Sequence, residues 1–267
     1  MLSVFISELK NRKINLIAYC VIGLALLWIY IALFPSIKDS SAQLDKLIQS
    51  YPKEFFRALG IQDLSFDTIE KFMSMELFTF EWPILAIVFA LSRAGGALAG
   101  EIEKGTMGLY LSLPVSRLRL FMAKYAAGIV SFAVLIVFTI VSAIPMAALY
   151  NIPINVMLIM KLSLLSLLFM WAIFAVAIFL SALSSERSKV YMLMGGGLLL
   201  MYAANVIAAL KTNLSWLHNL SIFNYYNAQE VLAKGNLKVS FVLVFVAVII
   251  LFSAAGALAF SKRDVAN

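Results

Sequence analysis

Six long apolar stretches constrain this chain more than any other feature of its sequence. The hydrocarbon core of a bilayer is about 30 Å thick, which matches roughly 20 helical residues. Backbone groups find no water there, so only helices and closed barrels can cross it. Runs such as 134–138 and 242–252 are apolar on every side, without the alternation of membrane strands. We therefore predict an all-α integral membrane protein with six spans, at about 14–34, 76–99, 125–150, 157–182, 190–210 and 239–260.

The composition agrees with this prediction and excludes a soluble protein. Hydrophobic residues make up 63% of the 267 residues and charged residues only 13%, whereas soluble domains carry roughly 45–50% and about 25%. The spacing of the apolar stretches sets the organisation, so residues 1–267 are predicted to form a single six-span domain surrounded by membrane lipids. A net charge of +7 could indicate a nucleic-acid partner, and the position of the basic residues decides against one.

The position of the positive charges along the chain predicts which ends of the spans face the cytoplasm. Residues 36–81 hold five basic and eight acidic residues, so the excess of positive charge lies elsewhere in the chain. Basic side chains near span ends are retained on the cytoplasmic side during insertion. Lys10, Arg12 and Lys13 precede the first span, and only Lys38 follows it closely. We predict that both termini are cytoplasmic, in the inner membrane of a prokaryotic cell, and that no nucleic acid binds.

The sequence offers few residues for catalysis or metal binding. Its single cysteine, Cys20, excludes an intramolecular disulfide, and its single histidine, His218, leaves no zinc constellation. The spans contain neither the residue pairs of a membrane-embedded enzyme nor the paired acids of a proton-driven carrier. We expect no metal site, no catalytic residue and no cofactor in this chain.

The segment between the first two spans, residues 35–75, is amphipathic. Apolar residues recur at helical spacing within 44–59. Asp67, with Glu70 three residues later, resembles a capping box at the start of a helix. The segment is predicted to be extracytoplasmic, as an interfacial lid on the spans or as a gate that contacts substrate.

The loop between the second and third spans, residues 101–124, is the most informative part of the chain. It carries Glu-Ile-Glu-Lys-Gly-Thr at 101–106 and Leu-Pro-Val-Ser-Arg at 113–117. A short helix after Pro114 is predicted to present Arg117 and Lys124 on the cytoplasmic side. A phosphate-binding loop would need Gly-Lys-Ser/Thr after a strand, so we do not expect this chain to bind nucleotide.

These motifs resemble those of the permease subunits of ABC-2-type transporters. The pattern Glu-x-Glu-x-Gly-Thr at 101–106, the stretch 113–117 and a lysine at the start of the third span carry the resemblance. It implies that a separate ATPase subunit, which holds ATP and Mg²⁺, docks on the cytoplasmic side. It also implies that two permease subunits, identical or different, form the path and export a substrate by alternating access.

The resemblance further implies which residues couple the two subunits. The loops at 101–124 and 183–189 would be the coupling elements, although the second also reads as an ordinary positive-inside loop. Glutamates would offer acceptors to the partner, a glycine would allow a sharp turn, and Arg117 would pair with an acidic groove. The coupling residues are Glu101, Glu103, Gly105, Thr106, Pro114, Ser116, Arg117, Glu186 and Arg187.

Charged and polar residues within the spans are few, and each costs free energy there, about 2.5–3.5 kcal/mol for a charge at mid-bilayer. Arg93 lies close enough to the cytoplasmic end to extend to that surface, the alternative being a pathway role. Lys161 can reach the outer interface in the same way. Asn205 is expected to bond to another helix or to contact substrate. Glu81 marks the outer part of the second span, as a pathway or packing residue.

Two glycine motifs permit close helix approach, within the subunit or across a dimer seam. They are Gly96-x-x-x-Gly100 and the run at 195–197. The apolar spans suit a lipid-like, peptide or hydrophobic drug cargo. The competing function is a non-transporting anchor or assembly factor that uses the same loops to hold a soluble partner.

Overall fold

The protein is an all-helical bundle. The computed structural model describes residues 2–40, 66–112 and 114–263, and no strand occurs among them. Six helical stretches in this part of the chain are long and apolar enough to cross a membrane, which confirms the predicted fold class. They are α2 (Lys13–Asp39), α5 to α6 (Ile69–Ala97), α9 to α10 (Arg117–Leu149), α11 (Val156–Leu183), α12 (Arg187–Leu210) and α15 (Val239–Lys262).

Two of these stretches are divided by π-turns, and shorter helices connect the rest. The second stretch comprises α5 (Ile69–Met75), η1 (Leu77–Glu81) and α6 (Trp82–Ala97), and the third comprises α9 (Arg117–Ile136), η2 (Val137–Val141) and α10 (Ala143–Leu149). The connecting helices are α1 (Leu2–Asn11), α7 (Ala99–Glu103), α8 (Met107–Leu111), η3 (Thr212–Leu220), α13 (Ile222–Tyr225) and α14 (Ala228–Leu232).

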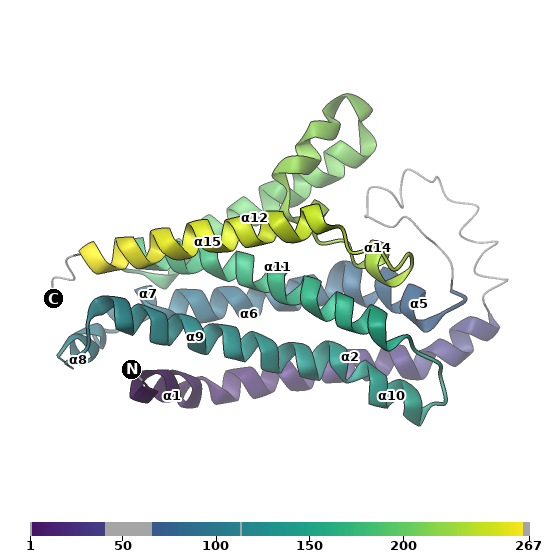
Figure 1. The fold of residues 1–267 in the computed structure, drawn as a ribbon, viewed down its shortest axis with the longest axis horizontal. Helices are drawn as coiled ribbons and strands as arrows, with labels where there is room; N and C mark the ends of the chain where they lie inside the picture. The colour runs from purple at the N-terminus through teal and green to yellow at the C-terminus, as the bar shows by residue number, and fades with distance from the viewer. Residues whose placement is uncertain (1, 41–65, 113, 264–267) are drawn as a thin grey trace.

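Helix α11 forms the centre of the bundle. Its most apolar window is 67% buried, against 17% for α12 and for α15, and it packs on α15, α6 and α9. Since every side of α11 is apolar, it can be surrounded by other helices. Helix α12 instead leaves the bundle, and its C-terminal half stands clear together with η3 (Figure 1). The core therefore lies around α11, and α12 turns most of its surface outward.

The α1 helix, the α7–α8 region and the end of α15 gather at one end of the bundle, which we call the loop end (Figure 1). The turn between α11 and α12 lies there too, since Arg187 contacts Glu103 of α7. Even numbers of spans return a chain to the side from which it started, as six do here. All the loops predicted to be cytoplasmic are thus on one side of the molecule.

The regions around the two π-turns are connected to each other and to α2 by Trp82, Thr139 and Gly23. Each π-turn precedes a proline, Pro83 in one case and Pro145 in the other; proline lacks the N–H that the next helical turn would use. Trp82 Nε1 donates to Thr139 Oγ1 at 3.0 Å, which joins the two stretches. Gly23 of α2 lies against the same threonine, because a Cβ there would be 2.1 Å from Thr139 Cγ2. The contact therefore requires a glycine in α2.

The end of the bundle opposite the loop end differs from the sequence prediction in one detail. Thr68 caps α5 and accepts from the Lys71 amide at 3.4 Å, so the capping box expected from Asp67 is wrong by one residue. Glu70 instead accepts from the Asn155 amide at 2.6 Å, which ties α5 to the start of α11. The amphipathic helices expected within 44–59 lie outside the described residues.

Candidate functional site

The first predicted coupling loop begins with a tight turn after α7. Gly105 has a φ of 70°, a conformation that side chains disfavour. Its amide donates to Ile102 O at 2.9 Å, and the Thr106 amide donates to Glu101 O at 2.9 Å, which closes the end of α7. The Thr106 hydroxyl also donates to the Glu101 carboxylate. The turn is thus fixed by its own residues, with Gly105 at the position that needs a glycine.

The second half of this loop leads directly into a membrane helix. Pro114 and Ser116 precede α9, and Ser116 Oγ caps it by accepting from the Arg119 amide at 3.4 Å. The helix then continues without interruption to Ile136, so the separate short helix expected after Pro114 is wrong. A proline here stops α8 from continuing, and the serine cap starts the next helix at once. Arg117 donates to the carbonyl oxygen of Arg263.

The second predicted coupling loop touches the first. Glu103 Oε2 accepts from the Arg187 amide at 3.0 Å and from its Nε at 3.3 Å. Hydrogen bonding from that amide, aided by the guanidinium charge, lowers the pKa of Glu103, so the carboxylate is ionised at neutral pH. Gly100 makes room for the arginine, since a Cβ there would be 2.8 Å from Arg187 Cδ. Glu186 pairs instead with Lys189 at 2.8 Å.

The residue that follows α15, Arg263, binds the end of α11 and the α11–α12 turn. The Arg263 guanidinium donates to Ala182 O at 2.7 Å, to Ser184 O at 2.8 Å and to Ser185 Oγ at 2.6 Å. The first of these carbonyls belongs to the last turn of α11, whose oxygens have no helical partner. Together with the Arg117 contact, this arginine binds both coupling loops to the C-terminal helix.

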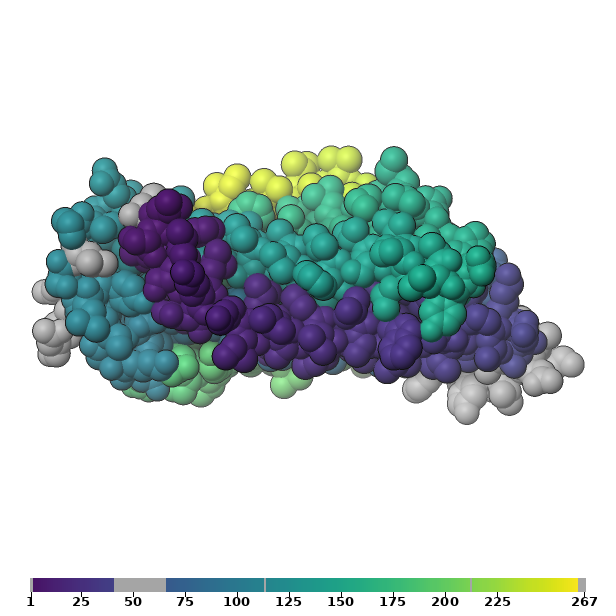
Figure 2. All heavy atoms as spheres, turned by 90° about the horizontal axis from the view of Figure 1, so that it is seen from below, coloured from purple at the N-terminus to yellow at the C-terminus, as the bar shows by residue number. Residues whose placement is uncertain are grey.

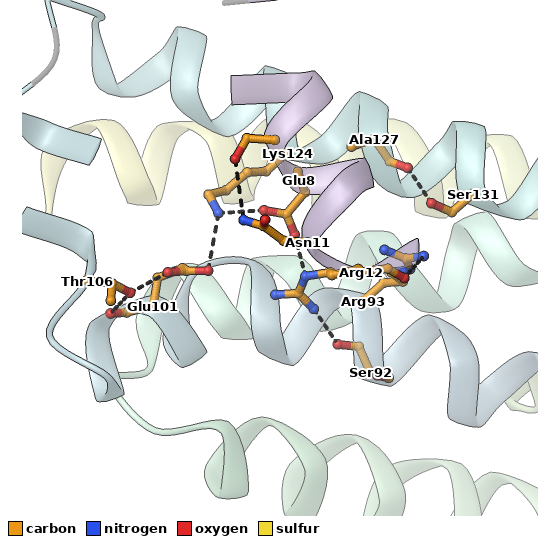
Figure 3. A network of polar contacts seen from close by, with 11 residues as sticks. Glu8, Asn11, Arg12, Ser92, Arg93, Glu101, Thr106, Lys124, Ala127 and Ser131 are labelled. Carbon is orange, nitrogen blue, oxygen red and sulfur yellow. Dashed lines mark hydrogen bonds and ion pairs between the residues drawn. The ribbon is translucent and has the colours of Figure 1, made fainter. Parts of the chain in front are cut away.

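Beneath the loops lies a network of charged side chains (Figure 3). Lys124 of α9 is 1% exposed, and its Nζ lies 2.8 Å from Glu8 Oε2 of α1 and 3.8 Å from Glu101 Oε1 of α7. The ammonium also lies 4.5 Å from the centre of the Tyr110 ring. The prediction that Lys124 faces the cytoplasm is wrong, because two carboxylates hold it inside. The Glu101 carboxylate therefore faces the interior of this chain.

Two arginines extend the network into the bundle. Arg12 Nε lies 2.5 Å from Glu8 Oε1, and a terminal nitrogen of Arg12 donates to Ser92 O at 3.2 Å. Arg93 donates to Arg12 O at 3.3 Å and is only 4% exposed. The prediction that Arg93 extends to the surface is therefore wrong. Gly96 provides the space, since a Cβ there would lie 2.3 Å from an Arg12 nitrogen.

Sequence reasoning missed Glu8. It occupies the inward face of α1 together with Val4, four residues earlier, and residues at that spacing share a helix face. A lone acid on the apolar face of an amphipathic helix is the pattern that could have indicated a buried cationic partner, because buried charges are paired.

Three further polar residues of the spans, each singled out from the sequence, contact other parts of this chain. Asn205 Oδ1 lies 2.9 Å from His218 Nδ1 of η3, the segment that folds back along α12. Glu81 accepts from the Tyr30 hydroxyl at 2.8 Å, while its Oε2 is buried without a partner. Lys161 reaches the segment before α15 and donates to Gly235 O at 2.8 Å. By contrast, within the described part of the chain no atom outside the helix's own backbone lies within 4 Å of a Cβ built at Gly195, Gly196 or Gly197.

Within the described ranges no three His, Cys, Asp or Glu side chains gather to hold a metal ion. The residues that converge at the loop end are charged pairs and helix caps, which fix loops to one another.

Comparison with known proteins identifies one family. A family model described as "ABC-2 family transporter protein" matches residues 2–265. No curated protein matches the chain.

Proposed function

Because this chain belongs to the ABC-2 family of transporter proteins, we propose that it is the membrane permease subunit of an ATP-driven exporter. In this proposal, ATPase subunits that hold ATP and Mg²⁺ dock on the loop end, which faces the cytoplasm together with both termini. A second permease subunit completes the path. The cargo would be lipid-like, a peptide or a hydrophobic drug, in keeping with the apolar spans.

The observation that carries this proposal is the joining of the two coupling loops at one end of the bundle. The Glu103–Arg187 contact links α7 to the start of α12, and Arg263 links the α11–α12 turn to α15. A force applied to either loop would therefore reach several spans at once.

The surface around this junction fits an acidic partner. Lys104, Arg119 and Lys189 are exposed in the segments that meet at the loop end, and Leu109 of α8 has 71% of its surface exposed. A leucine that enters a pocket surrounded by basic residues is a pattern of protein docking, since apolar anchors supply affinity and charges supply orientation. The acidic groove of an ATPase would match this surface.

The mechanism needs an energy source outside this chain. ATP binding would close the two ATPases and push the docked loops, and the stiff spans would carry that motion into alternating access between two permease halves. Among the described residues, no other element lies within 4 Å of a Cβ built at any of the glycines 195–197 of α12, so a second permease could approach this run closely.

The test is a capture experiment on the full-length chain from its native membrane in mild detergent. We expect an ABC ATPase to co-purify and its hydrolysis to rise when the permease is present. The double variant Lys104→Glu/Arg119→Glu should lose this partner. Lys211→Glu is the matched control, an exposed lysine beyond the far end of α12.

The outcomes separate the two candidate functions. Loss of the ATPase in the double variant and retention in the control supports docking at the loop end. An ATPase that binds but hydrolyses ATP at the same rate with or without the permease would favour the anchor function. Undiminished capture by the double variant would place the docking surface elsewhere.

A further inference from the structure

The Lys124 ammonium is shared by carboxylates from two separate elements. Glu8 lies on α1, and Glu101 lies on α7 within the first coupling loop. Both come to a lysine in the second turn of α9, more than a hundred residues from Glu8 in the chain. The three helices are thus joined by charge at one buried atom (Figure 3).

Burial makes this junction stiff. Separating a buried charge from its partner costs far more free energy than separating an exposed pair, because water cannot solvate the buried charge. The three groups therefore resist separation. Glu101 is held in turn by the Thr106 hydroxyl at the loop's tight turn. A displacement of that turn consequently pulls on Lys124 and, through it, on Glu8.

Helix α1 connects Glu8 to the start of α2, so a displacement of Glu8 would move the first membrane span. It lies on the outside of the bundle against α9 (Figure 2), and it joins α2 at Arg12, the residue that precedes the first turn of α2. Arg12 contacts both Glu8 and Ser92 of α6. The chain of contacts therefore runs from the loop turn to the entrance of the first membrane span.

We propose that Lys124 is a positioning residue that links the first coupling loop to α1 through Glu101 and Glu8, so that displacement of α7 moves the entrance of α2. This inference rests on the proposed function only in that an ATPase supplies the displacement. The link itself is a property of this chain, and it can be measured without the partner.

The first measurement follows the distance between α1 and α7 in the full-length chain. Cys20, the single cysteine, is replaced by alanine, and spin labels are placed at Lys10→Cys and Lys104→Cys, both exposed positions. The chain is studied in nanodiscs of phosphatidylethanolamine and phosphatidylglycerol. A single narrow distance peak is expected, because α1 and α7 are held together.

The test variant is Lys124→Met/Glu101→Gln. It removes one positive and one negative charge, so the net charge of the network is unchanged and Glu8 keeps Arg12. The amide oxygen introduced by Glu101→Gln can still accept from Thr106. We expect the narrow peak to be lost, and an unchanged peak would overturn the link. Should this variant fail to accumulate, Glu101→Gln alone, which leaves Lys124 paired with Glu8, is measured in the same way.

Two further variants separate charge from simple packing. Lys124→Arg keeps the positive charge and should retain the narrow peak; a peak lost as in the double variant would show that charge does not carry the link. Lys161→Met removes a lysine that is bonded at the opposite end of the bundle. It should leave the α1–α7 distance unchanged, and a broadened peak there would mean that the measurement reports general loosening.

The second measurement adds the ATPase that co-purifies with the unaltered chain. For each ATPase that it captures, Lys124→Met/Glu101→Gln should give less stimulation of hydrolysis than the unaltered chain, because the motion no longer reaches α2. Full stimulation would overturn the role in coupling. If the unaltered chain captures no ATPase, the proposed function fails, and the label distances still decide the link.

Discussion

Replacing Gly23 with alanine should destabilise the fold more than any similar change on an exposed helix face. The new Cβ would lie 2.1 Å from Thr139 Cγ2, where real Cβ contacts essentially never fall below 3.0 Å. Either α2 moves away from η2 or Thr139 rotates. Overpacking of this kind costs about 1–3 kcal/mol. Rotation of Thr139 would also break its hydrogen bond with Trp82, worth about 1 kcal/mol.

The expected loss in free energy of unfolding is therefore about 2–4 kcal/mol. It can be measured by unfolding the purified chain in dodecyl maltoside with increasing sodium dodecyl sulfate, followed by circular dichroism. Gly196→Ala is the matched control. The same methyl group there meets no atom within 4 Å, and alanine favours helix over glycine, so stability should not fall.

A rescue variant tests the cause of the loss. Thr139→Ser removes the offending methyl group and keeps the hydroxyl that accepts from Trp82. Gly23→Ala/Thr139→Ser should therefore recover most of the lost stability, as a double-mutant cycle would show. If Gly23→Ala proves as stable as the unaltered chain, or if the serine gives no recovery, the proposed steric cause is wrong.

Three further predictions concern the loop end. Gly105→Ala should lower the free energy of unfolding by about 1–2 kcal/mol, since φ is positive and no described atom lies close to the added methyl group. Gly105→Val should lower it further. Chemical unfolding measures both losses, and equal stability of the unaltered chain and the two variants would contradict the turn geometry. The Arg187 amide lowers the pKa of Glu103 below the ordinary 4.5. The contact between the loops should therefore persist as the pH falls to 4.5 and be lost only when the pH falls through the lowered pKa. Hydrogen exchange of the Arg187 amide reports this contact, and loss of its protection already above pH 4.5 would refute the prediction. Arg263→Ala should speed hydrogen exchange at 184–186, because two hydrogen bonds to the α11–α12 turn and a third to the last turn of α11 disappear. Lys262→Ala, on the neighbouring exposed residue, should leave this exchange unchanged.

The spans were predictable because their cause is local. Each stretch must satisfy its own backbone in hydrocarbon, so length and hydropathy decide its existence without knowledge of its neighbours. The turn at Gly105 and the cap at Ser116 follow from the same kind of local chemistry. Whether the coupling residues act as predicted depends on a partner and stays a prediction.

The buried network was beyond sequence reasoning for the opposite reason. Lys124 and Arg93 look like residues that reach the surface, and only the fold brings Glu8 and Arg12 beside them. The two π-turns could not be predicted either, because a proline indicates that a helix is kinked or broken but not that a π-turn forms before it.

Each of those π-turns sets the rotation of the helix that follows it, and so decides which side chains face the bundle. A π-turn holds one residue more than an α-helical turn, and one residue corresponds to about 100° of rotation. Deleting a single residue within 77–81 would restore a regular helix and turn every later side chain of that span about 100° around its axis. Arg93 and Gly96 would then both lose their contacts with Arg12, although the length and hydropathy of the span would hardly change. The extra residue of the π-turn therefore decides which side chains of α6 face Arg12 at the entrance of the first span.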